Sequence, residues 1–243
     1  MKSVKNLLVS LTLLMISTPL LLGGCQKSSD VEESENYLKA TSPVTVENEI
    51  YNEDCIVTPP DTIYPFEISM LEFMREEEKL ARDVYLTLYG QFQIPVFNNI
   101  SNSEQIHMDR VLYLLNFYGI PDPAQPEIGQ FTNPDLQDVY NALVQQGSAS
   151  LVAALTVGAT IEDLDIADLN EHIAETGNEA IQVIFGHLRC GSTNHLRAFT
   201  RLLSFHDVIY EPSYISQEEY EDIINGTFAD CMSGVNTMAP KAQ

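Results

Sequence analysis

The sequence predicts an all-α protein built on a bundle of four long helices, with one long crossover between the second and third helices. Apolar residues recur at spacings of three and four from about residue 61 to residue 228, and no segment alternates convincingly like a β-strand. A proline-rich connector at residues 120–133 interrupts this pattern, while the other breaks are short. We therefore expect the bundle to occupy residues 61–228.

Glycine, proline and capping residues set the expected helix ends. Gly90 is expected to stop the first helix, Pro95 to begin the second, and Asn178 to cap the fourth. One long connection among short turns is typical of the ferritin-like topology. The expected helices cover residues 67–89, 95–119, 134–146, 148–176, 178–205 and part of 211–228.

The composition excludes some classes of protein. The 243 residues include 35 acidic and 12 basic side chains, which give a formal net charge of -23. A nucleic-acid partner is excluded, because phosphate binding needs clustered cations. The four cysteines form no C-x-x-C pair, which argues against a rubredoxin-type iron site, a zinc ribbon or a thioredoxin motif.

The N-terminus has the layout of a secretory signal peptide. Lys2 and Lys5 precede an uncharged, mostly apolar stretch that ends in Leu22-Gly23-Gly24-Cys25, which resembles the lipobox of bacterial lipoproteins. We expect residues 1–24 to be removed and Cys25 to carry a lipid that anchors the protein to a bacterial membrane, outside the cytoplasm. The alternative is a transmembrane helix, but Ser, Thr and Pro residues interrupt the stretch.

Two flexible segments are expected to flank the bundle. Residues 25–60 are acidic and contain prolines, as in a tether, and residues 229–243 are expected to form a flexible tail. Cys55 and Cys231 lie at the two ends of the bundle, and the sequence leaves open whether they form a disulfide. Cys190 is expected to be a small buried or half-buried residue.

The second helix places polar residues where a bundle needs hydrocarbon. Glu104 and His107 fall on the same seam as Ile100 and Val111. A buried carboxylate needs a partner, and a metal ion is one such partner. Alternatively, Ser101 and Glu104 form the capping box of a shorter helix, which would place Glu104 at a surface terminus.

The third and fourth helices add polar groups at a matching depth. Glu162 and Asp165 share the inward seam of the third helix, whereas Asp163 and Asp168 are expected to be solvated. His195 falls near the middle of the inward seam of the fourth helix. The remaining histidines are expected to be caps, solvated groups or flanking residues: His172, His187 and His206.

The first helix offers two adjacent candidates. Helical periodicity places Glu77 nearest the centre of the apolar face and Glu78 at its edge, beside Tyr85. Periodicity alone therefore favours Glu77 as the inward carboxylate.

These residues together resemble the dimetal site of ferritin-like carboxylate proteins, in which Glu-x-x-His helices face Glu helices. The first helix carries Glu78-x-x-Ala81-Arg82-x-x-Tyr85, a spacing similar to that of the first bundle helix of rubrerythrins. Three segments resemble more closely the uncharacterised ferritin-like family DUF2202: residues 77–85, 103–108 and 194–199.

The resemblance implies two metal ions, most readily Fe, with Mn or Zn as alternatives. It assigns Glu78 rather than Glu77 as the ligand from the first helix, and it leaves Glu77, Tyr85 and Asn194 to orient the ligands. Ser192 stands where a rubrerythrin-like fourth helix has a carboxylate, which puts one bridging acid in doubt. The implied metal ligands are Glu78, Glu104, His107, Glu162, Asp165 and His195.

The sequence thus predicts an extracytoplasmic, lipid-anchored dimetal protein that oxidises Fe(II) or reduces peroxide or O₂. Peroxide turnover would need an external electron donor, because the chain has no rubredoxin-type cysteine quartet. A homo-oligomer is left open. Two alternatives are a non-catalytic lipoprotein whose inward polar residues form a hydrogen-bonded network or bind a single structural metal, and a module that binds a partner through its tail and acidic surface.

Overall fold

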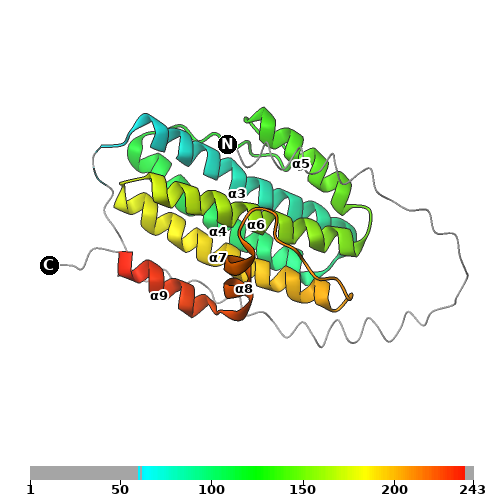
Figure 1. Cartoon of the computed structure of the whole chain (residues 1–243). Coiled ribbons are helices and arrows are strands. Elements are labelled where there is room, and N and C mark those ends of the chain that lie inside the picture. The colour runs from blue at the N-terminus through cyan, green and yellow to red at the C-terminus, as the bar shows by residue number, and fades with distance from the viewer. Residues whose placement is uncertain (1–59, 61, 239–243) are drawn as a thin grey trace, which may run out of the picture.

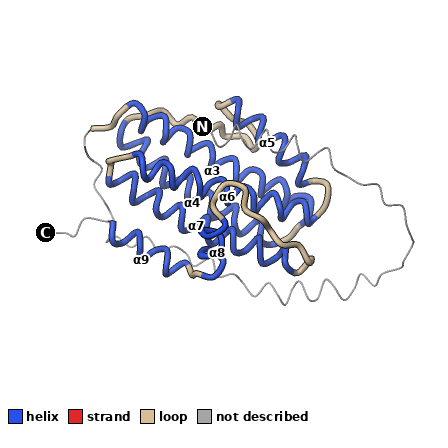
Figure 2. Tube along the Cα trace, in the orientation of Figure 1, coloured by secondary structure: helices blue, strands red, loops and turns tan. Residues whose placement is uncertain are grey.

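The computed structural model describes residue 60 and residues 62–238, the last three of these by their backbone only. Within these residues the regular structure comprises seven helices and no strand, which confirms the all-α class (Figure 2). No helix in this part of the chain is long and apolar enough to cross a membrane. The predicted signal peptide, lipidated Cys25, tether and Cys55 lie outside the described residues.

Four long helices enclose a single apolar core. α3 packs on α4, α4 on α7, α7 on α6 and α6 on α3, while α5 covers α3 and α6, and both α8 and α9 pack on α7 (Figure 1). The helices are α3 (Pro65–Phe92), α4 (Pro95–Tyr118), α5 (Pro134–Gly147), α6 (Leu151–Glu175), α7 (Glu179–Ser204), α8 (Gln217–Asn225) and α9 (Phe228–Met238).

Most of the predicted helix boundaries agree closely with the structure. Pro95 occupies the first turn of α4, and Asn178 caps α7 by accepting hydrogen bonds from two backbone N–H groups. The expected stop at Gly90 is wrong, because α3 continues to Phe92. Gln93 ends it instead, with a left-handed φ of 56° and a backbone N–H that donates to Tyr89.

The capping-box alternative for Ser101 and Glu104 is also wrong. Both residues lie inside α4, beyond its first turn, and the Ser101 hydroxyl donates to the Asn98 carbonyl. Glu104 is only 1% exposed, so its carboxylate faces the interior rather than a helix terminus at the surface.

The long connection between α4 and α5 is bound to the outer face of α3. Lys79 donates to the Glu127 carbonyl at 2.8 Å and lies 4.6 Å from the centre of the Phe131 ring. Asp83 accepts from the Gly129 backbone and from Lys79, and Glu76 accepts from the backbone N–H groups of residues 132 and 133. Buried charged groups on α3 therefore hold the crossover by satisfying its backbone.

Asp163 has a similar role on α6. We expected it to be solvated, but it is fully buried and accepts hydrogen bonds from Tyr210 and from the backbone of Ser213, Tyr214 and Ile215. Asp168 is only 2% exposed, which contradicts the same expectation for that residue. Both expectations failed because α6 is covered on more than one side, by helices and by the segment after α7.

A disulfide joins α7 to α9. Cys190 pairs with Cys231, so the pairing of Cys231 with Cys55 that the sequence left open is wrong, and Cys190 is not a free residue. The expected flexible tail is also corrected over residues 229–238, which belong to α9. Val235 of α9 packs against Gly186 of α7 and extends this contact.

Candidate metal centre

The four long helices bring histidine and carboxylate side chains together in the middle of the core. α3 contributes Glu78, and α4 contributes Glu104 and His107, one helical turn apart. α6 contributes Glu162 and α7 contributes His195. None of these residues is more than 6% exposed. Residues on the inward faces of four separate helices thus form a cluster of polar side chains inside an apolar core.

The first half of this group consists of Glu78, Glu104 and His107. The His107 Nδ1 atom lies 2.8 Å from Glu104 Oε2 and 3.1 Å from Glu78 Oε2. One ligand atom from each residue lies within 4.8 Å of the other two, which is close enough to surround a single metal ion.

The second half consists of Glu104, Glu162 and His195. The His195 Nδ1 atom lies 2.8 Å from Glu104 Oε1 and 3.4 Å from Glu162 Oε2. These residues also offer three ligand atoms within 4.8 Å of one another. The two imidazole rings stack with their centres 5.5 Å apart.

Glu104 belongs to both halves. Its Oε2 atom faces His107 and its Oε1 atom faces His195, so one carboxylate lies between the two imidazoles. The residues therefore form two adjacent three-ligand groups with a shared acid rather than one compact cluster.

Hydroxyl groups orient several of these ligands. Ser103 Oγ lies 2.9 Å from His195 Nε2, which leaves the other ring nitrogen toward the carboxylates. Tyr85 donates to Glu162, and Ser192 donates to Asp165. Such contacts fix the direction of a ligand's lone pairs. Tyr85 was predicted to orient ligands, whereas Ser103 was missed, although it directly precedes Glu104 in the sequence.

A glycine makes room for His107. A Cβ atom at Gly191 would lie 2.4 Å from His107 Nε2, far inside van der Waals contact. Only glycine allows α7 to approach the imidazole this closely. Helical periodicity could not identify Gly191, because a glycine carries no side chain with which to mark a buried face.

Burial and mutual charge shift the pKa values strongly in this group. Burial raises the pKa of Glu78 to about 8, although His107 opposes the shift. For His195, burial favours the neutral ring, but the carboxylates of Glu104 and Glu162 outweigh it and raise the pKa to about 10. His107 likewise has a raised pKa, because Glu104 and Glu78 outweigh its burial. Protons therefore balance the buried negative charge here, and a metal cation would compete with them.

Several buried polar atoms in the group lack a hydrogen-bond partner in the described part of the chain. They include Glu78 Oε1, Glu104 Oε1 and His195 Nδ1. The last two lie 2.8 Å apart and form an ion pair when the ring is protonated. A buried polar atom needs a partner, and either a proton on the imidazole or a metal cation can supply it at this point.

Asp165 lies beside the two groups and belongs to neither of them. It is 5% exposed, accepts a hydrogen bond from Ser192, and leaves Oδ1 without a hydrogen-bond partner among the described residues. Burial and the negative charges of Glu78 and Glu162 raise its pKa well above the usual range. Asp165 is thus a further carboxylate at the edge of the site, outside both three-ligand groups.

The choice between Glu77 and Glu78 is decided by their surroundings. Glu78 faces His107, whereas burial and the carboxylates of Asp168 and Asp165 raise the pKa of Glu77 well above its usual range. Both Glu77 oxygens are buried without a hydrogen-bond partner in the described structure. The rubrerythrin-like spacing therefore identified the residue that faces an imidazole, and periodicity alone did not.

Other predicted residues stay apart from the centre. Asn194 is half-buried on α7 and makes none of the hydrogen bonds that orient these ligands. His172 was expected to cap or to be solvated, but it is half-buried beside the rings of Phe73 and Phe185. Burial lowers its pKa to about 4.

The family model for the uncharacterised protein domain DUF2202 matches residues 67–227, which include the four long helices apart from the first two residues of α3. The chain belongs to the DUF2202 family. A relative described as the uncharacterised protein MJ0754 of Methanocaldococcus jannaschii is 56% identical over 155 residues, which are 63% of this chain and 84% of that protein.

A crystal structure of a DUF2202 relative agrees with the helical architecture. The hypothetical protein MJ0754 from Methanococcus jannaschii DSM 2661 is similar with a TM-score of 0.69 and 52% identity, over 71% of this chain and 99% of that chain. These relatives are described as uncharacterised or hypothetical. The comparison therefore supports the fold, and any inference about chemistry must come from the residues of the site.

Proposed function

We propose that this DUF2202 protein is a ferritin-like four-helix bundle that holds two metal ions, most readily iron, and oxidises Fe(II) or reduces peroxide or O₂. The single observation that carries this proposal is the position of Glu104. It presents one oxygen to each of two histidines, and each histidine has a further carboxylate within 3.4 Å of it. A carboxylate shared between two three-ligand groups is an arrangement that can hold a pair of cations.

The donor set supports iron, manganese or zinc over copper(I). Each group offers two carboxylates and one imidazole, and among the described residues the two cysteines, Cys190 and Cys231, are joined to each other and offer no thiolate. Oxygen-rich sites with imidazole suit these divalent ions, while a structural zinc site usually contains cysteine. Two Fe(II) ions bound here would supply the two electrons needed to reduce peroxide.

The protein's own residues would hold the ligands and exclude water. Tyr85 fixes Glu162, Ser103 fixes His195, and Asp165 remains available beside both groups with one unpaired oxygen. The aromatic rings of Phe97 and Phe199 pack against Tyr85 and close the apolar end of the site. Glu162 and His195 are therefore held in direction by hydroxyl groups, while Asp165 keeps one oxygen available to a metal ion.

We also propose that the protein works outside the cytoplasm, tethered through a lipid on Cys25. The layout of residues 1–25 supports this location. The disulfide between Cys190 and Cys231 supports it independently, since disulfides persist mainly in oxidising compartments. Repeated reduction of peroxide would then need an external reductant, whereas oxidation of Fe(II) would not.

The test is the number of tightly bound metal ions per full-length chain after anaerobic loading with Fe(II). We expect about two per chain, as the two groups imply, and loss of both in Glu104→Gln, which keeps the shape of the side chain but removes its charge. Glu171→Gln, an exposed acid on α6, is the matched control and should bind like wild type.

The loading experiment separates the alternatives. One ion per chain would replace the dimetal proposal with a single structural metal, and no ion in a folded protein would overturn it. If two ions bind, stopped-flow mixing with peroxide and with O₂ should reveal oxidation of the bound iron. Two ions that are inert to both oxidants would retain the metal site and overturn the oxidoreductase activity.

A further inference from the structure

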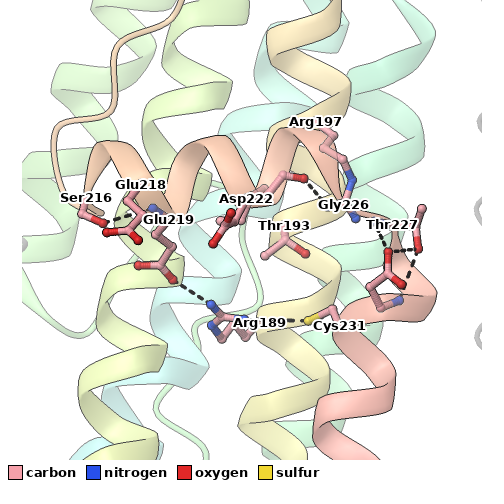
Figure 3. Close-up of a pocket in the computed structure, with 12 residues that line it drawn as sticks. Arg189, Thr193, Arg197, Ser216, Glu218, Glu219, Asp222, Gly226, Thr227 and Cys231 are labelled. Atoms are coloured by element: carbon pink, nitrogen blue, oxygen red, sulfur yellow. Dashed lines mark hydrogen bonds and ion pairs between the residues drawn. The ribbon is translucent and has the colours of Figure 1, made fainter.

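A second group with redox chemistry lies outside the candidate metal centre. The Cys190–Cys231 disulfide borders a cavity of about 370 Å³ between α7, α8 and α9. Figure 3 shows Arg189, Thr193 and Arg197 of α7 on one side of this cavity, facing α8 and Cys231. The cavity is large enough for a small organic molecule.

The two sulfurs differ in accessibility. Cys231 lines the cavity and is partly exposed, whereas Cys190 is fully buried. A molecule in the cavity can therefore reach the Cys231 sulfur and not the Cys190 sulfur. An attacking thiolate in the cavity would therefore contact the Cys231 sulfur.

A cation stands beside the accessible sulfur. Arg189 Nη1 lies 3.8 Å from Cys231 Sγ (Figure 3). A neighbouring guanidinium stabilises a thiolate and so favours negative charge on that sulfur. The position of Arg189 is itself held by Glu219 at 2.7 Å and by Asn170.

The charges that line the cavity favour a cationic ligand. Arg189 is paired with Glu219, and Asp230 is the anionic neighbour of Arg197. The other two acids in the lining, Glu218 and Asp222, form no ion pair among the described residues.

We propose that this cavity is a thiol–disulfide exchange site that accepts small thiols carrying a positive charge. The small thiol releases its proton to solvent and its thiolate attacks Cys231 Sγ. The Cys190–Cys231 bond breaks, its electron pair leaves on Cys190, and Cys190 takes a proton from solvent. A second thiolate attacks the small-molecule sulfur of the mixed disulfide and releases Cys231 as a thiolate beside Arg189. Two thiols are oxidised to one disulfide, and the protein disulfide is reduced to two thiols.

The exchange would act on the helix that the disulfide holds. α9 contacts α7 through Cys231 and through Val235, which packs on Gly186. Reduction removes the covalent part of this contact and leaves the apolar part. The proposal does not depend on the candidate metal centre, because the cavity shares no lining residue with it.

The experiment measures reduction of this disulfide in the folded full-length chain by three small thiols of different charge. Cysteamine is the cation, 2-mercaptoethanol the neutral thiol and 3-mercaptopropionate the anion, compared at equal thiolate concentration and low ionic strength. Alkylation of the released thiols, followed by peptide mass analysis, assigns the reaction to Cys190 and Cys231. Cys190→Ser/Cys231→Ser gives the background from Cys25 and Cys55.

We expect cysteamine to react on the order of tenfold faster than 3-mercaptopropionate, since charged clefts raise the local concentration of a counter-ion. Glu218→Gln/Asp222→Asn should remove most of this ratio, because both carboxylates are exposed and border the cavity. The matched control Glu127→Gln/Asp138→Asn removes two exposed acids near α5 and should keep the ratio.

Three results would overturn the proposal. The first is reduction only under denaturing conditions, which would make the disulfide purely structural. The second is an equal rate for all three thiols. The third is a charge preference that both double variants reduce equally, because the preference would then come from the net charge of the whole protein.

Discussion

Two sets of buried carboxylates, one facing loops and one facing the interior, show how the same residue type takes opposite roles in this protein. Asp163 and Glu76 face connecting segments and accept backbone hydrogen bonds from them. Glu78 and Glu104 face the interior, where they meet histidines, and Glu78 keeps one oxygen without a hydrogen-bond partner in the described structure. We call Asp163 and Glu76 the loop-holding set and Glu78 and Glu104 the interior set. The oxygens of the loop-holding set have hydrogen-bond donors within the protein, whereas one oxygen of the interior set has none among the described residues.

The difference teaches that burial alone does not identify a metal ligand. Backbone N–H groups that donate to a carboxylate favour its anion, although burial outweighs them at Glu76 and raises the pKa of that residue. A carboxylate without such donors must take a proton or share a cation. Glu76, Glu77 and Glu78 are consecutive, yet the 100° turn between helical neighbours points them at a loop, at other acids and at an imidazole.

The largest expected effect on stability comes from a substitution in the loop-holding set. Asp163→Ala should lower the free energy of unfolding by about 3 to 5 kcal/mol, because several buried donors lose their acceptor together. Urea denaturation measures this loss, and metal stoichiometry at low temperature should stay unchanged. Glu104→Gln should differ by losing the metal, and it should also lower the free energy of unfolding of the metal-free protein, because the imidazoles of His107 and His195 lose their anionic partner. Equal behaviour of the two variants would remove the distinction between the sets.

The second prediction concerns the pH dependence of stability that comes from His172, a histidine outside the candidate metal centre. The pKa of His172 in the folded protein is about 4, below its ordinary value of 6.5, because burial disfavours the imidazolium. The unfolded chain therefore binds the extra proton first, so this contribution to stability is complete above about pH 6.5 and is lost as the pH falls toward 4. The full loss is at most about 3 kcal/mol, reduced by partial exposure of the ring.

His172→Gln isolates this contribution from the rest of the acid response. Urea midpoints measured between pH 7 and pH 4.5 should fall less steeply in the variant than in wild type. Identical slopes would mean that His172 titrates normally in the folded protein.

The third prediction concerns the approach of α7 to the interior set. Gly191→Ala should cost about 1 to 3 kcal/mol, because the added methyl group overlaps His107, and it should weaken metal binding. Gly90→Ala in α3 is the matched control, since a Cβ atom there meets nothing within 4 Å. That control should be neutral or stabilising by about 0.5 to 1 kcal/mol, as expected inside a helix. Unfolding and metal titration measure both variants, and similar results for both would contradict the close approach.

The smallest effect is expected from a residue that orients a ligand. Ser103→Ala removes the contact to His195 Nε2, so the ring can rotate more freely. Loss of such a contact typically lowers metal affinity by about 10 to 100-fold, and we expect the lower end for a single hydroxyl. Competition with a chromogenic chelator measures this affinity. Ser101→Ala, whose hydroxyl bonds only within α4, should leave the affinity unchanged.

The sequence predicted the interior set better than the loop-holding set. The seams of α4 and α7 placed Glu104, His107 and His195 correctly, because each of these helices presents one main apolar face to the core. α6 is different, since five consecutive residues from Glu162 to Ile166 are buried. Periodicity could therefore select its inward seam but could not reveal that Asp163 on another face is also covered.

Contacts between residues distant in the sequence could not be predicted. Cys190 and Cys231 are 41 residues apart, and spacing alone could not choose between this pair and one with Cys55. The crossover gave no sign that Lys79 and Asp83 would be buried beneath it. Local patterns determine which face of a helix is apolar, whereas the partner of each face depends on the path of the whole chain.

The shared position of Glu104 also has a thermodynamic consequence. Because the same side chain completes both groups, the two groups cannot fill independently of each other. Occupation of one group fixes the torsions of Glu104, so its second oxygen is already oriented for the other, and the entropy of ordering is lost only once. Linkage then requires each event to favour the other by the same factor. We expect the loading curve to be cooperative, with a Hill coefficient above one.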